Sequence, residues 1–207
     1  MRQGLNKRQQ QAYNTKWNIY NRAHELFREK GYDAVGVEEI AEAAGVSVGL
    51  FYYYFKNKQE ILAIYHENVD DDYSRYYNDA RASGAWQDKT VLEILEEVTL
   101  YICQVCVEQG VEYIRIVYPY MLTNQDFGHA MINRERAYFS IMNELLTRGI
   151  ERGEIADTFE PQQLVSDITK LLRGCIVDWC INDGREDIRE RSRSFIAIFL
   201  RGIAAHV

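Results

Sequence analysis

The chain has 207 residues, of which 47% are apolar and 27% are charged, and its net charge is −7. These totals predict a core large enough for one or two domains, and only two prolines favour long helices over a turn-rich all-β architecture. No apolar run approaches the ~18 residues that cross a bilayer, and the polar N-terminus lacks the apolar core of a signal peptide. We therefore expect a cytoplasmic protein with no membrane partner.

The charges are distributed unevenly along the chain. Residues 1–58 carry nine Lys or Arg against six Asp or Glu, which gives +3, whereas residues 59–207 carry fifteen against twenty-five, which gives −10. A basic head on an acidic body indicates one end that faces nucleic acid.

Apolar periodicity and capping residues predict an all-α fold of about nine helices with no strand. Asn57, with Glu60 three residues later, is expected to cap the fourth helix. Pro119 is expected to kink or end the sixth. The predicted helices span residues 10–30, 37–44, 48–55, 57–81, 90–108, 111–122, 127–152, 161–181 and 187–205.

The second and third helices have the spacing of a helix-turn-helix. Counting from Val37, the fifth residue is Ala41, a small side chain where the two helices cross, and the ninth is Gly45, which suits a left-handed turn. Ser47 can cap the third helix. The positions that this motif turns inward are apolar in this chain: Ile40, Ala44, Val46, Phe51 and Tyr54.

Five aromatic residues follow one another at positions 51–55, and a helical wheel divides them by role. Phe51, Tyr54 and Phe55 share the inward face, whereas Tyr52 and Tyr53 point outward with Val48 and Gly49. Outward tyrosines can donate to phosphates and touch thymine methyl groups. Gly49 leaves room for the backbone to approach the major groove, and Lys58 offers a phosphate contact beside free backbone amides.

The helix-turn-helix and the residues around it resemble the DNA-binding domain of the TetR (tetracycline-repressor-like) family of bacterial transcriptional regulators. The resemblance lies in "AHELFREKGYDAVGVEEIAEAAGVSVGLFYYYFKNKQEIL". It implies a DNA-binding domain over residues 1–58 and a ligand-binding and dimerisation domain over residues 59–207. The predicted DNA-binding residues are Lys7, Arg8, Ser47, Val48, Gly49, Tyr52, Tyr53 and Lys58.

The chain departs from the family pattern at two places. Val35 and Gly36 stand just ahead of the second helix, where family members often have Ser or Thr. The hydroxyl group that usually caps this helix and contacts a phosphate is therefore missing. The third helix also has no Lys or Arg, so bidentate contacts to guanine are unavailable from it. We expect readout through apolar and tyrosine contacts and a preference for A·T-rich sites. We also expect a flexible arm of Asn6, Lys7 and Arg8, on which the lysine and arginine supply positive charge.

The second half of the chain is dense in aromatic and methionine side chains, which are typical of a core and also of an apolar ligand pocket. We expect a pocket for an aromatic or lipophilic molecule among residues 100–180. The candidate ligand-binding residues are Tyr113, Arg115, Tyr118, His129, Tyr138 and Trp179.

The broad apolar stripes of the last two helices predict a homodimer, and in the resembled family these helices pair across a two-fold axis. Two recognition helices about 34 Å apart would read a palindromic operator. The sequence thus predicts a ligand-responsive regulator, most simply a repressor, with double-stranded DNA and a small-molecule effector as partners and with no cofactor.

Two other readings stay open. Cys103 and Cys106 form a C-x-x-C that could serve a metal or redox sensor with the same head, although buried cysteines usually act as small apolar residues. A helical enzyme is the second rival. The chain offers it no P-loop, no dinucleotide fingerprint and no H-E-x-x-H metal pair, and no catalytic or metal-binding residue is assigned.

Overall fold

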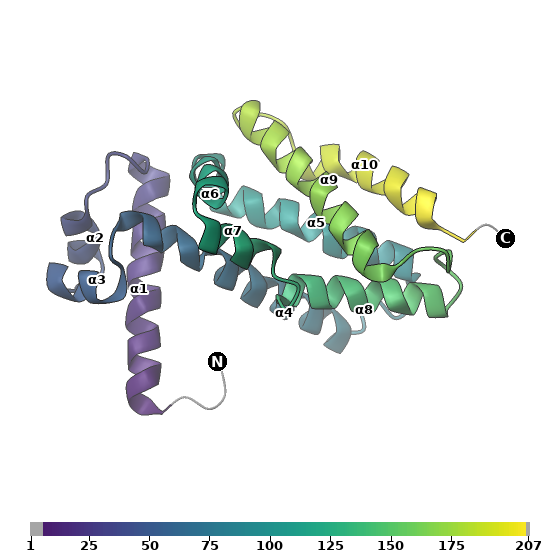
Figure 1. The fold of residues 1–207 in the computed structure, drawn as a ribbon, viewed down its shortest axis with the longest axis horizontal. Coiled ribbons are helices and arrows are strands. Elements are labelled where there is room, and N and C mark those ends of the chain that lie inside the picture. The colour runs from purple at the N-terminus through teal and green to yellow at the C-terminus, as the bar shows by residue number, and fades with distance from the viewer. Residues whose placement is uncertain (1–5, 206–207) are drawn as a thin grey trace. The chain divides into compact units, whose positions relative to one another are not determined.

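The computed structural model describes residues 6–205, apart from the side chains of residues 65–68. These residues form ten α-helices and one 3-10 helix and no β-strand, which confirms the all-α prediction (Figure 1). No helix in this part of the chain is both long and apolar enough to span a bilayer. The helical elements are α1 (Lys7–Lys30), α2 (Val37–Ala43), α3 (Val48–Tyr54), η1 (Lys58–Ile64), α4 (Tyr65–Ala82), α5 (Val91–Gln109), α6 (Val111–Thr123), α7 (Gln125–Ile132), α8 (Ala137–Glu151), α9 (Pro161–Ile181) and α10 (Ile188–Ile203).

The chain packs as two compact units. The first comprises Met1–His66 with Glu112–Gly128, and the second comprises Glu67–Val111 with His129–Val207. The predicted functional boundary after residue 58 lies inside the first unit, because η1 packs against α1 there.

In the first unit, α1 begins at Lys7, three residues earlier than predicted. The side chain of Asn6 accepts a hydrogen bond from the Gln9 amide at 2.9 Å, and the Gln9 side chain accepts one from the Asn6 amide at 3.0 Å. This reciprocal capping box satisfies amides that the first helical turn leaves unpaired. The helix ends at Gly31, whose φ of 84° lies in the region that favours glycine.

The second unit is a helical bundle around α5. This helix packs against α8, α9 and α10, and α9 also packs against α8 and α10. Thr90 and Glu93 cap α5 in a second capping box. The interior is closed by apolar side chains, among them Leu95, Val98, Leu100, Leu145, Leu146, Leu172 and Ile196.

The predicted long helix over residues 127–152 is wrong, because a turn at residues 133–136 separates α7 from α8. The Asn133 side chain accepts a hydrogen bond from the Glu135 amide at 3.0 Å, which is a local alternative to helical pairing. Arg136 then leaves the helical path to contact Asp70 of α4, at 2.9 Å from Nε and 3.1 Å from Nη2. Its Nη1 also donates to the Met131 carbonyl at 3.0 Å.

Two further helix boundaries differ from expectation. α6 continues through Pro119 to Thr123, whose hydroxyl donates to the Pro119 carbonyl at 2.9 Å, so the proline does not end the helix. The predicted fourth helix starts as the 3-10 segment η1, and regular α-helix begins only at Tyr65. Asn57 does cap this segment, since its side chain accepts from the Glu60 amide at 3.0 Å.

The buried ion pair between Arg136 and Asp70 yields a stability prediction. The two side chains are only 8% and 17% exposed. We expect Arg136→Met to lower the free energy of unfolding by about 3–5 kcal/mol, because the Asp70 carboxylate then stays buried without its counterion. Adding Asp70→Leu should recover most of that loss, because it removes the stranded charge.

The exposed pair between Arg81 and Glu144 serves as the control, with the two side chains 54% and 51% exposed. Arg81→Met should cost less than about 1 kcal/mol. Urea unfolding measures all three variants. Equal losses for Arg136→Met and Arg81→Met would show that the buried pair does not hold the bundle.

Candidate DNA-binding surface

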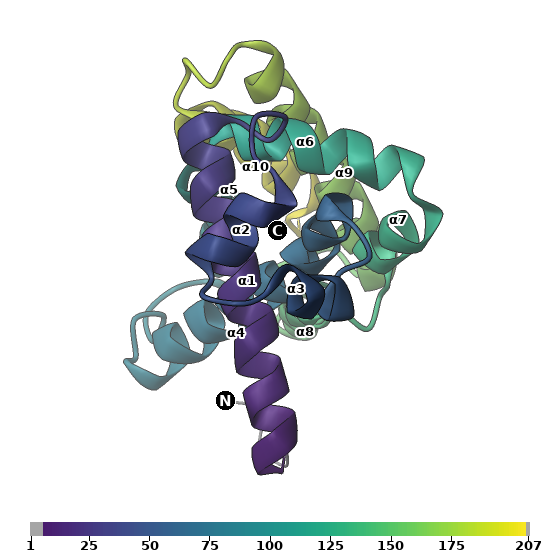
Figure 2. The ribbon, with the colours of Figure 1, turned by 90° about the vertical axis from the view of Figure 1, so that its left-hand side faces the viewer.

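α2 and α3 form the helix-turn-helix, and they lie in front of α1 in the view of Figure 2. Ala41 is 1% exposed at the point where the helices meet, so a larger side chain would push them apart. Gly45 has a φ of 66°, the left-handed conformation that the motif requires. The turn is closed by the Val46 amide, which donates to the Ala41 carbonyl at 2.9 Å.

The inward face of the motif is apolar, as predicted. Ile40 and Phe51 are fully buried and Phe55 is 2% exposed, whereas Val46 and Tyr54 are half-buried. A polar tether that the sequence analysis missed joins α1 to the turn, since the Asn18 side chain donates to the Ala44 carbonyl at 2.7 Å. This hydrogen bond could not be predicted from the sequence, because nothing about an asparagine in a mostly polar stretch of α1 indicates an acceptor 26 residues away.

The outward face of α3 presents apolar and tyrosine side chains to solvent. Tyr52 is 50% exposed and Tyr53 is 77% exposed, and Val48 and Leu50 are also exposed. Ser47 caps the helix by accepting a hydrogen bond from the Leu50 amide at 3.1 Å. These side chains therefore lie where a DNA-reading helix would need them.

Gly49 lies in the middle of this exposed face, and nothing inside the protein requires a glycine there. A Cβ atom built on it would meet no atom closer than the Ser47 hydroxyl, at 3.9 Å, and its φ is not in the left-handed range. The missing side chain thus leaves open space on the outside of α3.

The positive charges predicted for this surface are placed differently from expectation. Lys7 and Arg8 are exposed but belong to the first turn of α1, so the expected flexible arm is wrong at these residues. The Lys58 ammonium turns inward and donates to the carbonyls of Tyr32 at 2.6 Å and Val35 at 2.9 Å. It also lies 4.1 Å from the centre of the Tyr32 ring. Lys58 therefore clamps the loop before α2, and its predicted phosphate contact finds no support in this geometry.

The start of α2 shows the effect of the departure at Val35 and Gly36. Gly36 is the N-cap residue, and no side chain caps the helix. Glu38 and Glu39 in the first turn face the positive end of the helix dipole instead.

The six predicted ligand-binding residues are divided between the two units. In the first unit, Tyr113 is buried against His24 with ring centres 4.5 Å apart, Arg115 pairs with Glu112 at 3.3 Å, and Tyr118 is half-buried.

In the second unit, His129 is exposed, while Tyr138 and Trp179 are buried and have internal partners. The Tyr138 hydroxyl lies 3.1 Å from the Thr169 hydroxyl, and the Trp179 indole donates to the Glu186 carbonyl at 3.1 Å. The structure does not bring the six residues together.

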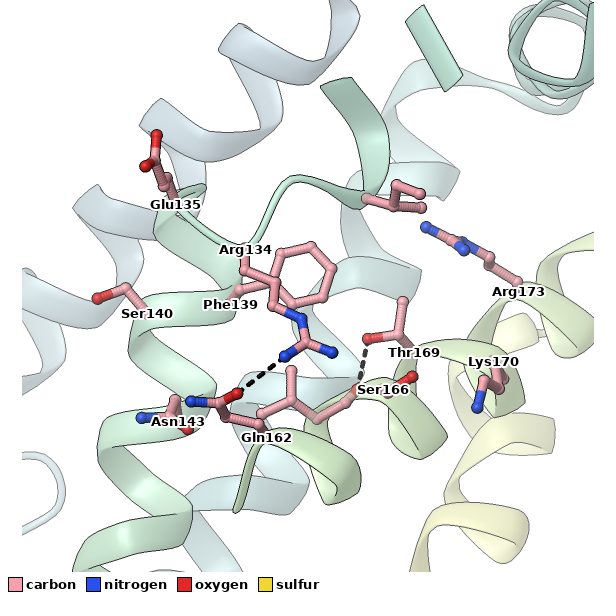
Figure 3. A pocket seen from close by; sticks show the side chains of 12 residues that line it. Arg134, Glu135, Phe139, Ser140, Asn143, Gln162, Ser166, Thr169, Lys170 and Arg173 are labelled. Atoms are coloured by element: carbon pink, nitrogen blue, oxygen red, sulfur yellow. Dashed lines mark hydrogen bonds between the residues drawn. The ribbon is translucent and has the colours of Figure 1, made fainter. Parts of the chain in front are cut away.

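A cleft of about 560 Å³ between α8 and α9 lies among residues 100–180, where a pocket was expected, but none of the six candidate residues lines it. Its walls are drawn in Figure 3. They consist of Ile132, Arg134, Glu135, Phe139, Ser140, Asn143, Gln162, Val165, Ser166, Thr169, Lys170 and Arg173.

The C-x-x-C residues lie in the interior of the second unit. Cys103 and Cys106 are buried, and burial raises the pKa of the Cys103 thiol to about 11, so it is protonated at neutral pH. A sensor cysteine or metal ligand needs the thiolate. Among the side chains of residues 6–64 and 69–205, no group of three or more His, Cys, Asp or Glu could hold a metal ion. Nothing in this geometry supports the metal or redox reading.

Comparisons with known proteins agree with this architecture. The family model for bacterial regulatory proteins of the tetR family matches residues 19–64. The fatty acid metabolism regulator protein of Bacillus subtilis (strain 168) is 27% identical over 188 residues, covering 89% of this chain and 93% of that protein.

Two solved structures share the fold. FadR from Bacillus subtilis, in complex with stearoyl-CoA, has a TM-score of 0.70 at 24% identity, covering 90% of this chain and 98% of that chain. FadR from Thermus thermophilus, a TetR-family repressor in complex with lauroyl-CoA, has a TM-score of 0.68 at 21% identity. The match covers 93% of this chain and 96% of that chain.

A helix-turn-helix with an outward-facing second helix, followed by a helical body, defines a DNA-binding transcriptional regulator. Residues 19–64 match the tetR family of bacterial regulatory proteins, and the chain as a whole has the fold of TetR-family structures. The relatives that it matches are transcriptional regulators and not enzymes.

The open space at Gly49 yields a prediction for DNA binding. We expect Gly49→Ala to weaken operator binding at least tenfold, because the added methyl group would hold the backbone of α3 away from the major groove. Stability should stay unchanged or rise by up to about 1 kcal/mol, because alanine favours a helix. Fluorescence anisotropy and thermal melting measure the two effects. Unchanged operator affinity in a folded variant would place the DNA away from Gly49.

Proposed function

We propose that this chain is a homodimeric repressor in the cytoplasm, released from a palindromic operator by an acyl-CoA-type effector. The proposal that the chain binds DNA rests on one observation. A short helix, α3, exposes one face and buries the opposite one, and the exposed face carries Val48, Gly49, Tyr52 and Tyr53. Such a helix can enter the major groove without loss of its own packing.

The chemistry of this helix favours a particular kind of operator. Because α3 has no Lys or Arg, base readout would come from tyrosine and apolar contacts, which suit thymine methyl groups. Lys7 and Arg8, exposed at the start of α1, supply charge for phosphates, and Ser47 adds a hydroxyl at the start of α3. An A·T-rich half-site fits this surface best.

The dimer interface is proposed on exposed faces of α9 and α10. Val177 and Ile181 on α9 are 43% and 72% exposed, and Phe195 and Ile198 on α10 are 52% and 62% exposed. On each helix the two residues lie one turn apart and share a face. Apolar patches of this kind mark protein interfaces.

Two glycines extend these faces. Gly174 lies three residues before Val177 and Gly202 lies four residues after Ile198, and a Cβ at either would meet no atom within 4 Å. Small residues in an apolar stripe allow a partner helix to approach closely. This pattern supports a four-helix interface between two copies of the chain.

The effector class is proposed from the relatives. The curated Bacillus subtilis relative covers nearly the whole chain and is named for fatty acid metabolism, and two structures with the same fold hold stearoyl-CoA and lauroyl-CoA. A lipophilic effector also agrees with the sequence-based expectation. We assign residues 59–207 to effector binding and dimerisation and residues 1–58 to DNA binding.

Release would follow from a shift between dimer conformations. An effector that binds more tightly to the conformation in which the two α3 helices no longer match successive major grooves lowers operator affinity. A coupling of about 1–3 kcal/mol changes affinity by about 5–150-fold. α4 continues from η1 into the second unit and is one of the covalent links between the two units.

The interface proposal predicts the behaviour of a charged variant. Phe195→Glu combined with Ile198→Glu should convert the dimer to a monomer in sedimentation velocity, because four carboxylates would meet across the two-fold axis. Operator affinity should fall by at least tenfold, because one α3 helix contacts only one half-site. Leu122→Glu, on an α6 residue that is 81% exposed, is the control and should remain dimeric. A dimeric double variant would locate the interface elsewhere.

The effector proposal is tested with operator DNA from upstream of the protein's own gene. Fluorescence anisotropy should show that the protein binds this duplex more tightly than random DNA and that lauroyl-CoA releases it. Phenol, an aromatic molecule without an acyl chain, should leave the complex intact. Release by phenol and not by lauroyl-CoA would replace the acyl-CoA class with an aromatic one. Equal affinity for both duplexes would contradict specific operator binding.

A further inference from the structure

The cleft between α8 and α9 carries more positive than negative charge. Arg134, Lys170 and Arg173 line it together with one carboxylate, Glu135, which gives a net charge of +2. Arg134 comes from the turn before α8, whereas Lys170 and Arg173 come from α9. The cleft therefore collects cations from two separate parts of the chain (Figure 3).

The two guanidinium groups are held by neutral oxygens. Arg134 donates from Nη1 to the Gln162 side-chain oxygen at 2.8 Å, and Arg173 donates from Nη2 to the Met131 carbonyl at 3.4 Å. Their charges are thus oriented but are not neutralised by these partners. Lys170 differs, because it pairs with Asp167 at 2.9 Å on the exposed side of α9.

Asn143 supplies a second, independent sign of a ligand. Its side-chain oxygen is buried and has no hydrogen-bond partner within the protein, and the residue lines the cleft. A buried polar group without a partner costs about 1–3 kcal/mol. A hydrogen-bonding ligand in the cleft would remove that cost.

The remaining walls are suited to an apolar group. Ile132, Phe139 and Val165 line the same cleft, and Ile132 is 52% exposed although it is large and apolar. The volume of about 560 Å³ is within the range of about 300–1,000 Å³ for small-molecule sites. A ligand with a multiply charged anionic group and an apolar part would match both kinds of wall.

We propose that this cleft binds the phosphate-bearing headgroup of the effector. Arg134 and Arg173 contact the phosphate oxygens through their planar forks. The Asn143 side-chain oxygen accepts a hydrogen bond from an N–H or O–H group of the headgroup, and Phe139 and Val165 contact the start of the apolar chain. Two guanidinium groups that no carboxylate in the described part of the chain neutralises favour phosphates over a single carboxylate. This assignment rests on the proposed function, since it names the part of the effector that this site recognises.

The test removes the two charges that the proposal uses. Arg134→Gln with Arg173→Gln keeps hydrogen-bonding side chains but removes both positive charges. Isothermal titration calorimetry with lauroyl-CoA, free coenzyme A and lauric acid should show at least a tenfold loss of affinity for the first two ligands only. Arg185→Gln is the control, because Arg185 is 81% exposed beside Asp183 and lies outside the cleft.

A second variant adds a negative charge at an exposed position, so that folding is not at risk. Ser140 lines the cleft in the first turn of α8, where an acidic side chain agrees with the helix dipole. Ser140→Asp should also lower the affinity for lauroyl-CoA and coenzyme A several-fold and leave the affinity for lauric acid unchanged.

The outcomes separate the two proposals. If wild-type protein binds lauroyl-CoA and both cleft variants bind it equally well, the cleft assignment is wrong and the effector class stands. If wild-type protein does not bind lauroyl-CoA, both the effector class and the headgroup assignment are wrong. An equal loss of affinity for lauric acid would contradict the headgroup assignment, because the effect of the variants would then not be specific to the phosphates.

Discussion

The buried ion pair between Arg136 and Asp70 constrains how α4 and the turn between α7 and α8 are held in the second unit. It joins α4 to the turn between α7 and α8 over 66 residues of sequence, and both side chains are largely removed from water. Arg136 also holds the end of α7 through the Met131 carbonyl. The same turn contributes Arg134 and Glu135 to the cleft between α8 and α9. A ligand that moves this turn therefore acts on the segment that fixes α4, without any intervening element.

The head could be predicted from the sequence because its rules are local. Ala41 and Gly45 are required by a helix crossing and a left-handed turn only four residues apart, and the burial of Phe51 and Phe55 follows from helical periodicity. Each of these constraints acts within one or two turns of helix. The fold class and the faces of α3 were accordingly predicted correctly, whereas contacts between α3 and DNA stay predictions.

The body could be predicted only as a set of helices. Residue type alone indicated that Lys58 would face phosphate, but two loop carbonyls take up its ammonium group. The hydroxyl of Tyr138 and the indole of Trp179 likewise face partners inside the second unit, where they were expected to anchor a ligand. The cleft is lined by residues that carry no motif, because it arises from the angle between two helices and a turn. Such sites depend on tertiary packing, which periodicity does not encode.

The distribution of charge explains why a modest effector coupling can control this protein. The −10 charge of residues 59–207 repels DNA, and the +3 charge of residues 1–58 opposes it only in part. With no cation on α3, phosphate contacts are expected from positive side chains elsewhere in the first unit, such as the exposed Lys7 and Arg8 at the start of α1. Operator binding then rests on the fit of two α3 helices to two grooves more than on bulk attraction. The geometric fit is lost when the two DNA-binding heads change their spacing. A coupling free energy of a few kcal/mol between effector binding and DNA binding therefore suffices to release the DNA.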